Sequence, residues 1–227
     1  MIKKTHKKGS PIFEKFKKLD REQPFDIVSF FKHYEVSFQE LDFNEQNHLL
    51  SAYGDALFKL GRHRPYLKVA DCLIELSILQ NIRFVQGEDI YRKSLYQKGL
   101  AYFYLHDYRA ASHIARELIK LSPEHRSYRN LLRRCMVRER PAYVKQLIGA
   151  GASIYLFCVL LVLIEFIFVA RFHAEYQPYI EYFRIVAFGV GLLALIGGES
   201  IHHWNIRQKI SKYTEEAKLR KNEKKKY

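Results

Sequence analysis

The sequence LIGAGASIYLFCVLLVLIEFIFVA, residues 147–170, is apolar over almost its whole length. About 20 apolar residues are enough for a helix to cross the hydrocarbon of a bilayer, and this run carries one charge, Glu165, near its end. The core helix of a soluble protein is rarely apolar on every face over such a length. We therefore predict that residues 147–170 span a membrane.

A second apolar run follows at residues 185–204. It is uninterrupted as far as Gly198 and then contains Glu199, His202 and His203, so it is the weaker of the two predicted spans. The connection between the runs, residues 171–184, is short. Two spans joined in this way predict a transmembrane hairpin over residues 141–204.

The net charge of +14 is concentrated at the N-terminus and beside the two apolar runs. Residues 1–18 hold seven basic residues and one acidic residue, residues 124–145 hold seven and two, and residues 205–227 hold nine and three. Basic residues beside a span stay on the cytoplasmic side, so both termini are predicted to be cytoplasmic and to contact anionic lipid. The same charge permits nucleic-acid binding, but topology already accounts for it and we predict no nucleic-acid partner.

The N-terminal and C-terminal segments of the chain are both rich in basic residues. Residues 1–23 are lysine-rich, have no apolar run of the kind found in a secretory signal, and are predicted to form a flexible arm. This arm either remains in solvent or contacts the membrane surface. Residues 205–227 are predicted to form a basic cytoplasmic tail, with a frayed helix at its end.

Residues 24–140 are predicted to be helical throughout. Apolar residues recur at helical spacing, and prolines or glycines separate the segments. No stretch shows the sustained alternation of a strand. The fold class is therefore predicted to be all-α, with antiparallel helix pairs and short joints, and the expected helices begin at Pro24 and Pro65 and cover residues 44–59, 89–105, 108–121 and 125–138.

The helices at 89–105 and 108–121 carry a specific residue pattern. Small residues stand where two helices must cross, tyrosines stand beside them, and a proline follows the second helix: Gly99, Tyr102, Tyr108, Ala111, Ala115 and Pro123. This pattern resembles a tetratricopeptide repeat (TPR). A weaker copy precedes it around Gly54, although Gly54 and Gly99 are 45 residues apart against a repeat length of about 34. The resemblance covers residues 48–123 and implies a TPR-like domain capped by the flanking helices.

The resemblance also implies a binding surface, because TPR domains hold a peptide or a partner helix on the concave face of their first helices. The matching positions in this chain are Lys93, Tyr96, Leu100, Phe103 and Tyr104 in the better repeat and Phe58 in the weaker one, together with Ser51, Asp55 and Lys59. The alternative is that these side chains only pack against neighbouring helices.

Small residues also mark the predicted spans. Ala187, Gly191, Ala194 and Gly198 recur at intervals of 4, 3 and 4 and share one helical face, and Gly149 and Ser153 form a similar pair in the first span. Such faces let helices approach closely in lipid. They predict packing within the hairpin, with self-association of several hairpins as the alternative.

Few residues suggest chemistry. Charged or titratable groups inside a span mark function by default, and here they are Glu165 near the outer end and Glu199, His202 and His203 near the inner end. The two sets lie at opposite depths, which argues against one ion pathway in a single hairpin. The cysteines Cys72, Cys135 and Cys158 are far apart and suit a reducing compartment. We predict no metal site, no cofactor and no enzymatic activity, since no catalytic motif is present.

These features together predict a membrane-anchored, non-enzymatic adaptor. A TPR-like domain would recruit or scaffold a protein partner at the cytoplasmic face, and the hairpin would fix it to the membrane. The alternative is a membrane effector whose hairpins oligomerise into a pore or channel under control of the repeat domain.

Overall fold

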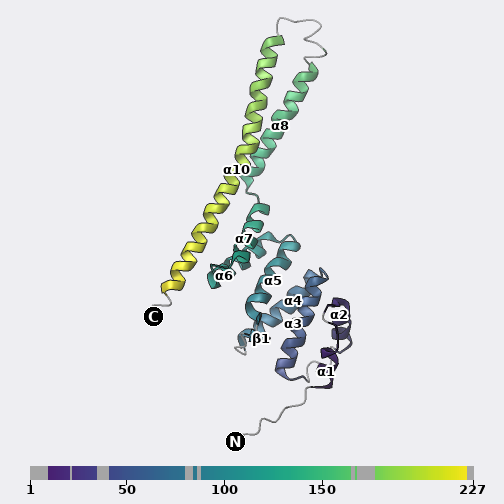
Figure 1. Cartoon of the computed structure of the whole chain (residues 1–227). Helices are drawn as coiled ribbons and strands as arrows, with labels where there is room; N and C mark the ends of the chain where they lie inside the picture. The colour runs from purple at the N-terminus through teal and green to yellow at the C-terminus, as the bar shows by residue number, and fades with distance from the viewer. Residues whose placement is uncertain are drawn as a thin grey trace. The chain divides into compact units, whose positions relative to one another are not determined.

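The computed structural model describes residues 10–20, 22–34, 41–79, 84–85, 88–164, 167 and 177–223. It divides into two compact units, the first formed by Met1–Cys135 with Ala217–Tyr227 and the second by Met136–Glu216. Nearly all described residues are helical (Figure 1), which confirms the prediction of an all-α protein. A short antiparallel ladder, in which β1 (Phe84–Val85) pairs with β2 (Glu88–Asp89), lies between the helix that ends at Leu79 and the helix that begins at Ile90.

The first unit is built from consecutive helices whose starts are fixed by local signals. Pro24 occupies the first turn of its helix, and Asp89 and Asp107 accept hydrogen bonds from the backbone N–H groups of Arg92 and Ala110 at 3.0 Å. The helices are α1 (Pro11–Lys17), α2 (Pro24–His33), α3 (Phe43–Lys59), α4 (His63–Leu79), α5 (Ile90–Tyr104), α6 (Tyr108–Leu121) and α7 (Arg126–Arg138).

Glycines allow the helices of this unit to approach one another. A Cβ added at Gly54 of α3 would lie 3.3 Å from Val69 on α4. At Gly99 of α5, it would lie 3.0 Å from Leu131 on α7 and 3.2 Å from Ile114 on α6. The core around these crossings is apolar and tightly filled, and its most deeply buried members include Leu49, Leu57, Tyr66, Leu118, Ile119, Leu131 and Leu132.

The N-terminal stretch differs from the flexible arm that we predicted for residues 1–23. Helix α1 lies inside it, with Ser10 as its cap and Pro11 in its first turn. Phe16 is only 2 % exposed, and its ring lies 5.8 Å from both Phe30 and His48. The basic composition of this segment obscured one well-buried aromatic residue, and that residue holds α1 against the following helices.

The second unit contains two long helices, α8 (Ala142–Ile164) and α10 (Gln177–Glu223), which run side by side (Figure 1). Both are long and apolar enough to cross a membrane, and only 11 % and 17 % of their apolar windows are buried. A core helix of a soluble protein would be mostly buried. Glu165 and the first part of the connection at 171–184 lie outside the described residues.

Both long helices have limits that differ from the predicted spans, and α8 ends at Ile164. Helix α8 begins at Ala142 rather than Leu147, and α10 covers the whole stretch from Gln177 to Glu223. At 1.5 Å per residue, the 47 residues of α10 extend about 70 Å. The predicted tail at 205–227 is therefore largely the continuation of a membrane-length helix, because its Lys, Arg, Glu and Ala residues all favour the helical state.

Candidate functional site

The partner face predicted from the TPR resemblance lies on α3 and α5, and part of it is occupied by a polar network. Lys93 Nζ lies 2.7 Å from Asp55 Oδ2, and Gln97 Nε2 donates to Asp55 Oδ1 at 2.9 Å. The hydroxyl of the fully buried Tyr66 donates to Gln97 Oε1 at 2.9 Å. Burial is the main cause that raises the pKa of Tyr66, with the Asp55 charge adding to it. The network joins α3, α4 and α5.

Two further residues of that face connect α5 to α7. The ring of Tyr96 lies 5.5 Å from that of Tyr128, whose pKa is raised mainly by burial. The guanidinium of Arg134 lies 4.5 Å from the centre of the Phe103 ring, within the range of a cation–π contact. Leu100 is half-buried on the same helix. These contacts agree with the packing alternative for Tyr96 and Phe103.

The remaining aromatic residues of the predicted face, Phe58 and Tyr104, form a partly exposed cluster with His63 of α4. Tyr104 is 47 % exposed and stacks on His63 with ring centres 4.8 Å apart and an interplanar angle of 15°. Phe58 contacts both rings, at 5.4 Å from His63 and 6.3 Å from Tyr104. Burial lowers the pKa of His63. We call Phe58, His63, Phe103 and Tyr104, with Arg134 over Phe103, the aromatic edge.

The residues predicted to pack the repeats lie at helix crossings or beside them. Ala111 and Ala115 of α6 are fully buried, and Pro123 is also fully buried. Tyr102 is half-buried on α5, and Tyr108 contacts Phe103 with ring centres 5.5 Å apart. Together with the crossings at Gly54 and Gly99, this arrangement places the small residues where bulk would force helices apart.

The small residues of the hairpin do not all face the partner helix. Gly191 and Gly198 of α10 lie against Ile154 and Leu147 of α8, at 3.2 and 3.4 Å from an added Cβ. Ala187 and Ala194 are half-buried beside them on the same helix.

On α8 the prediction needs a correction. A Cβ at Gly149 would meet nothing within 4 Å, and Ser153 Oγ donates to the Gly149 carbonyl at 3.0 Å within its own helix. Gly151 makes the close approach instead, at 2.8 Å from Leu195. The sequence signal for it is the spacing of seven residues among Val144, Gly151 and Cys158, all of which are buried.

The inner polar residues of the second span lie close to the start of α8. Glu199 lies 3.4 Å from Arg140 Nη2 and 3.6 Å from His203 Nε2. Asn205 Nδ2 donates to the Tyr143 hydroxyl at 3.4 Å. His202 is 4 % exposed, and its Nε2 atom has no hydrogen-bond partner. Within the described part of the chain, no three His, Cys, Asp or Glu side chains group in a way that would hold a metal ion.

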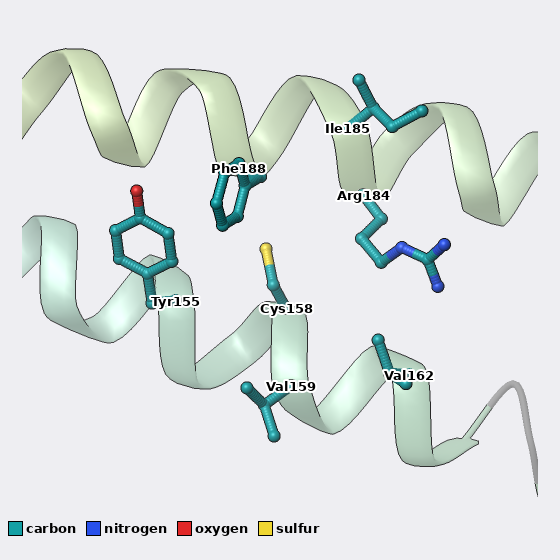
Figure 2. Close-up of a pocket in the computed structure, with 7 residues that line it drawn as sticks. All are labelled: Tyr155, Cys158, Val159, Val162, Arg184, Ile185 and Phe188. Atoms are coloured by element: carbon teal, nitrogen blue, oxygen red, sulfur yellow. The ribbon is translucent and has the colours of Figure 1, made fainter.

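An apolar cleft of about 330 Å³ lies between α8 and α10, at the end of the hairpin opposite these polar residues. In Figure 2 the sulfur of Cys158 points across the cleft toward α10, and the Arg184 side chain extends into the space between the helices near Val162. The sequence did not predict this cleft, because it depends on where the two helices separate. Its lining is Tyr155, Cys158, Val159, Val162, Arg184, Ile185 and Phe188.

Comparison with known proteins adds no relative to this description. No protein-family model, curated protein or solved structure matched the chain.

Proposed function

We propose that this protein is a membrane-anchored, non-enzymatic adaptor whose TPR-like helical unit recruits a protein partner at the cytoplasmic face of a membrane. The observation that carries the proposal is the combination, in one chain, of a helical unit with its own buried core and two membrane-length helices whose apolar side chains remain exposed. The first is suited to holding a partner and the second to fixing it in lipid.

Packing within the hairpin supports the anchoring role. Gly151, Gly191 and Gly198 lie where α8 and α10 of the same chain contact each other. Large apolar side chains point outward from both helices, among them Leu156, Leu160, Leu193 and Ile196. Because the two interfacial flanks, 124–145 and 205–227, carry the basic excess, we assign both termini to the cytoplasm.

The aromatic edge is the surface that we assign to the partner. Lys93 and Tyr96 already contact Asp55 and Tyr128 of neighbouring helices, whereas nearly half of Tyr104 is exposed. Tyrosine and arginine are enriched among residues that dominate binding energy at interfaces. An aromatic ring beside the exposed Arg134 suits a segment that offers an apolar side chain next to a carboxylate.

A site-specific photocrosslinking experiment tests this assignment in the full chain and in native membranes. A benzophenone amino acid replaces Tyr104 in one variant and Leu79 in a control variant, since Leu79 is also exposed but lies outside the aromatic edge. We expect a discrete crosslinked protein from position 104 and none from position 79. The adaptor proposal fails if position 104 gives no discrete product, or if both positions give the same products.

A further inference from the structure

The apolar cleft between α8 and α10 has the features of a binding site for an amphiphile. Six of its seven lining residues have apolar side chains or, in Cys158 and Tyr155, a thiol or a single hydroxyl group. The seventh, Arg184, carries a positive charge. Its volume of about 330 Å³ lies at the lower end of the range for small-molecule sites. The cleft therefore offers an apolar surface with one cation beside it.

The cleft is open to whatever surrounds the hairpin. Ile185 is 62 % exposed, and Val159 and Phe188 on the two helices are also exposed. If the hairpin is inserted in a bilayer, the surroundings at this depth are lipid chains. A flexible acyl chain fills an irregular apolar space without leaving a polar group unsatisfied.

Arg184 determines what kind of head group fits. It directly precedes the apolar run that begins at Ile185, so it stands where the hydrocarbon of a bilayer would end. A guanidinium carries five N–H donors and binds phosphate in a bidentate manner, so it can hold a phosphate together with another acceptor. Its side chain extends into the cleft between the helices (Figure 2).

We propose that the cleft binds one anionic phospholipid, with an acyl chain between Val159, Val162 and Phe188 and its phosphate on Arg184. This inference rests on the proposed insertion of the hairpin and adds a specific lipid site at the end opposite to the basic flanks. The preference is for net negative lipid, because a zwitterionic head group brings its own cation to compete with Arg184.

The test uses tryptophan fluorescence of the full chain in vesicles. Trp204 is the single tryptophan, so a Trp204→Phe background allows one reporter to be placed at a time. Ile185→Trp places the reporter in the cleft lining, and Tyr182→Trp places a control one turn away on α10, where Tyr182 is 73 % exposed and does not line the cleft. The vesicles contain phosphatidylglycerol or phosphatidylcholine of identical chains, brominated to quench nearby tryptophan.

We expect the reporter at position 185 to be quenched more strongly by the anionic lipid at equal mole fraction, with a preference of about tenfold, the order of one charge-assisted hydrogen bond. The control at 182 shows a much smaller preference. Arg184→Gln reduces the preference at 185 to the control value, and Arg184→Lys retains part of it.

Two results overturn the lipid site while leaving membrane insertion intact. One is equal lipid preference at positions 185 and 182, or a preference at 185 that survives Arg184→Gln. The other is quenching at 182 with none at 185, which means that protein covers the cleft. Absence of quenching at both positions contradicts insertion itself, and the lipid site with it.

Discussion

His202 is an unusual residue because it is buried and only partly satisfied. Its Nε2 atom has no hydrogen-bond partner, and the charged or titratable groups of the same cluster are Arg140, Tyr143, Glu199 and His203. A buried polar atom without a partner costs about 1–3 kcal/mol. The His202 ring lies 6.1 Å from the His203 ring, a contact that leaves Nε2 without a hydrogen-bond partner.

His202→Leu is therefore expected to stabilise the protein by about 1–3 kcal/mol, since it removes the unsatisfied nitrogen and keeps the side chain's bulk. The measurement is the thermal midpoint of the detergent-solubilised full chain at pH 7.5. His203→Leu is the matched control, because His203 is half-buried and lies near Glu199. A lower midpoint for His202→Leu than for the control would contradict this account of the residue.

The burial of His63 is expected to make the stability of the folded protein depend on pH. Its pKa lies below the ordinary value of 6.5 in the folded protein because burial disfavours the charged ring. The unfolded chain therefore binds more protons near pH 6, so this residue's contribution is fully present above about pH 6.5 and is lost as the pH falls below it. Denaturation midpoints measured between pH 7.5 and 5 should fall less steeply for His63→Phe than for the parent. An unchanged slope would show that His63 is not responsible.

At the scale of the helices, the close contact between α8 and α10 depends on Gly151 and not on the nearby Gly149. A Cβ at Gly151 would lie 2.8 Å from Leu195 Cγ and 3.4 Å from the Gly191 carbonyl oxygen, so the Leu195 side chain or the helices must shift to accept it. A Cβ at Gly149, two residues earlier, meets nothing within 4 Å. These two positions provide a matched pair.

Gly151→Ala is expected to destabilise the hairpin by about 1–3 kcal/mol, the usual cost of overpacking a close contact. Gly149→Ala should be neutral or slightly stabilising, because alanine favours the helix. Thermal midpoints of the full chain in detergent report the difference. Equal effects of the two substitutions would mean that α8 and α10 do not pack through Gly151.

The comparison of predicted and observed helices shows which structural features can be predicted from local sequence. The helix predicted at 108–121 coincides with α6, since Asp107, Tyr108 and Ser122 give its limits locally. Phe16 was missed because its burial depends on a contact with the distant residue His48. Gly151 was missed because its seven-residue spacing from Val144 and Cys158 does not reveal its contact with the distant residue Leu195. Likewise the periodicity placed Lys93 and Tyr96 on one helix, but their partners Asp55 and Tyr128 follow from packing.

At the scale of the whole molecule, the proposed adaptor requires a hairpin that crosses a membrane twice. The exposed apolar surfaces of α8 and α10 and the basic segments beside them are the physical basis for that view. A hairpin places the start of α10 on one side of the membrane and both chain ends on the other. The pore alternative would share this topology, whereas a soluble helical protein would not.

The most direct measurement is labelling of cysteines introduced one at a time, with a membrane-impermeant maleimide in sealed membranes. Exposed Cys72 is replaced by serine, the buried Cys135 and Cys158 are kept, and Ser10→Cys, Tyr179→Cys and Asn222→Cys are compared one at a time. We predict that position 179 reacts only from the non-cytoplasmic side and that positions 10 and 222 react only from the cytoplasmic side. Reaction of all three from the same side would contradict the membrane-spanning hairpin and the adaptor built on it.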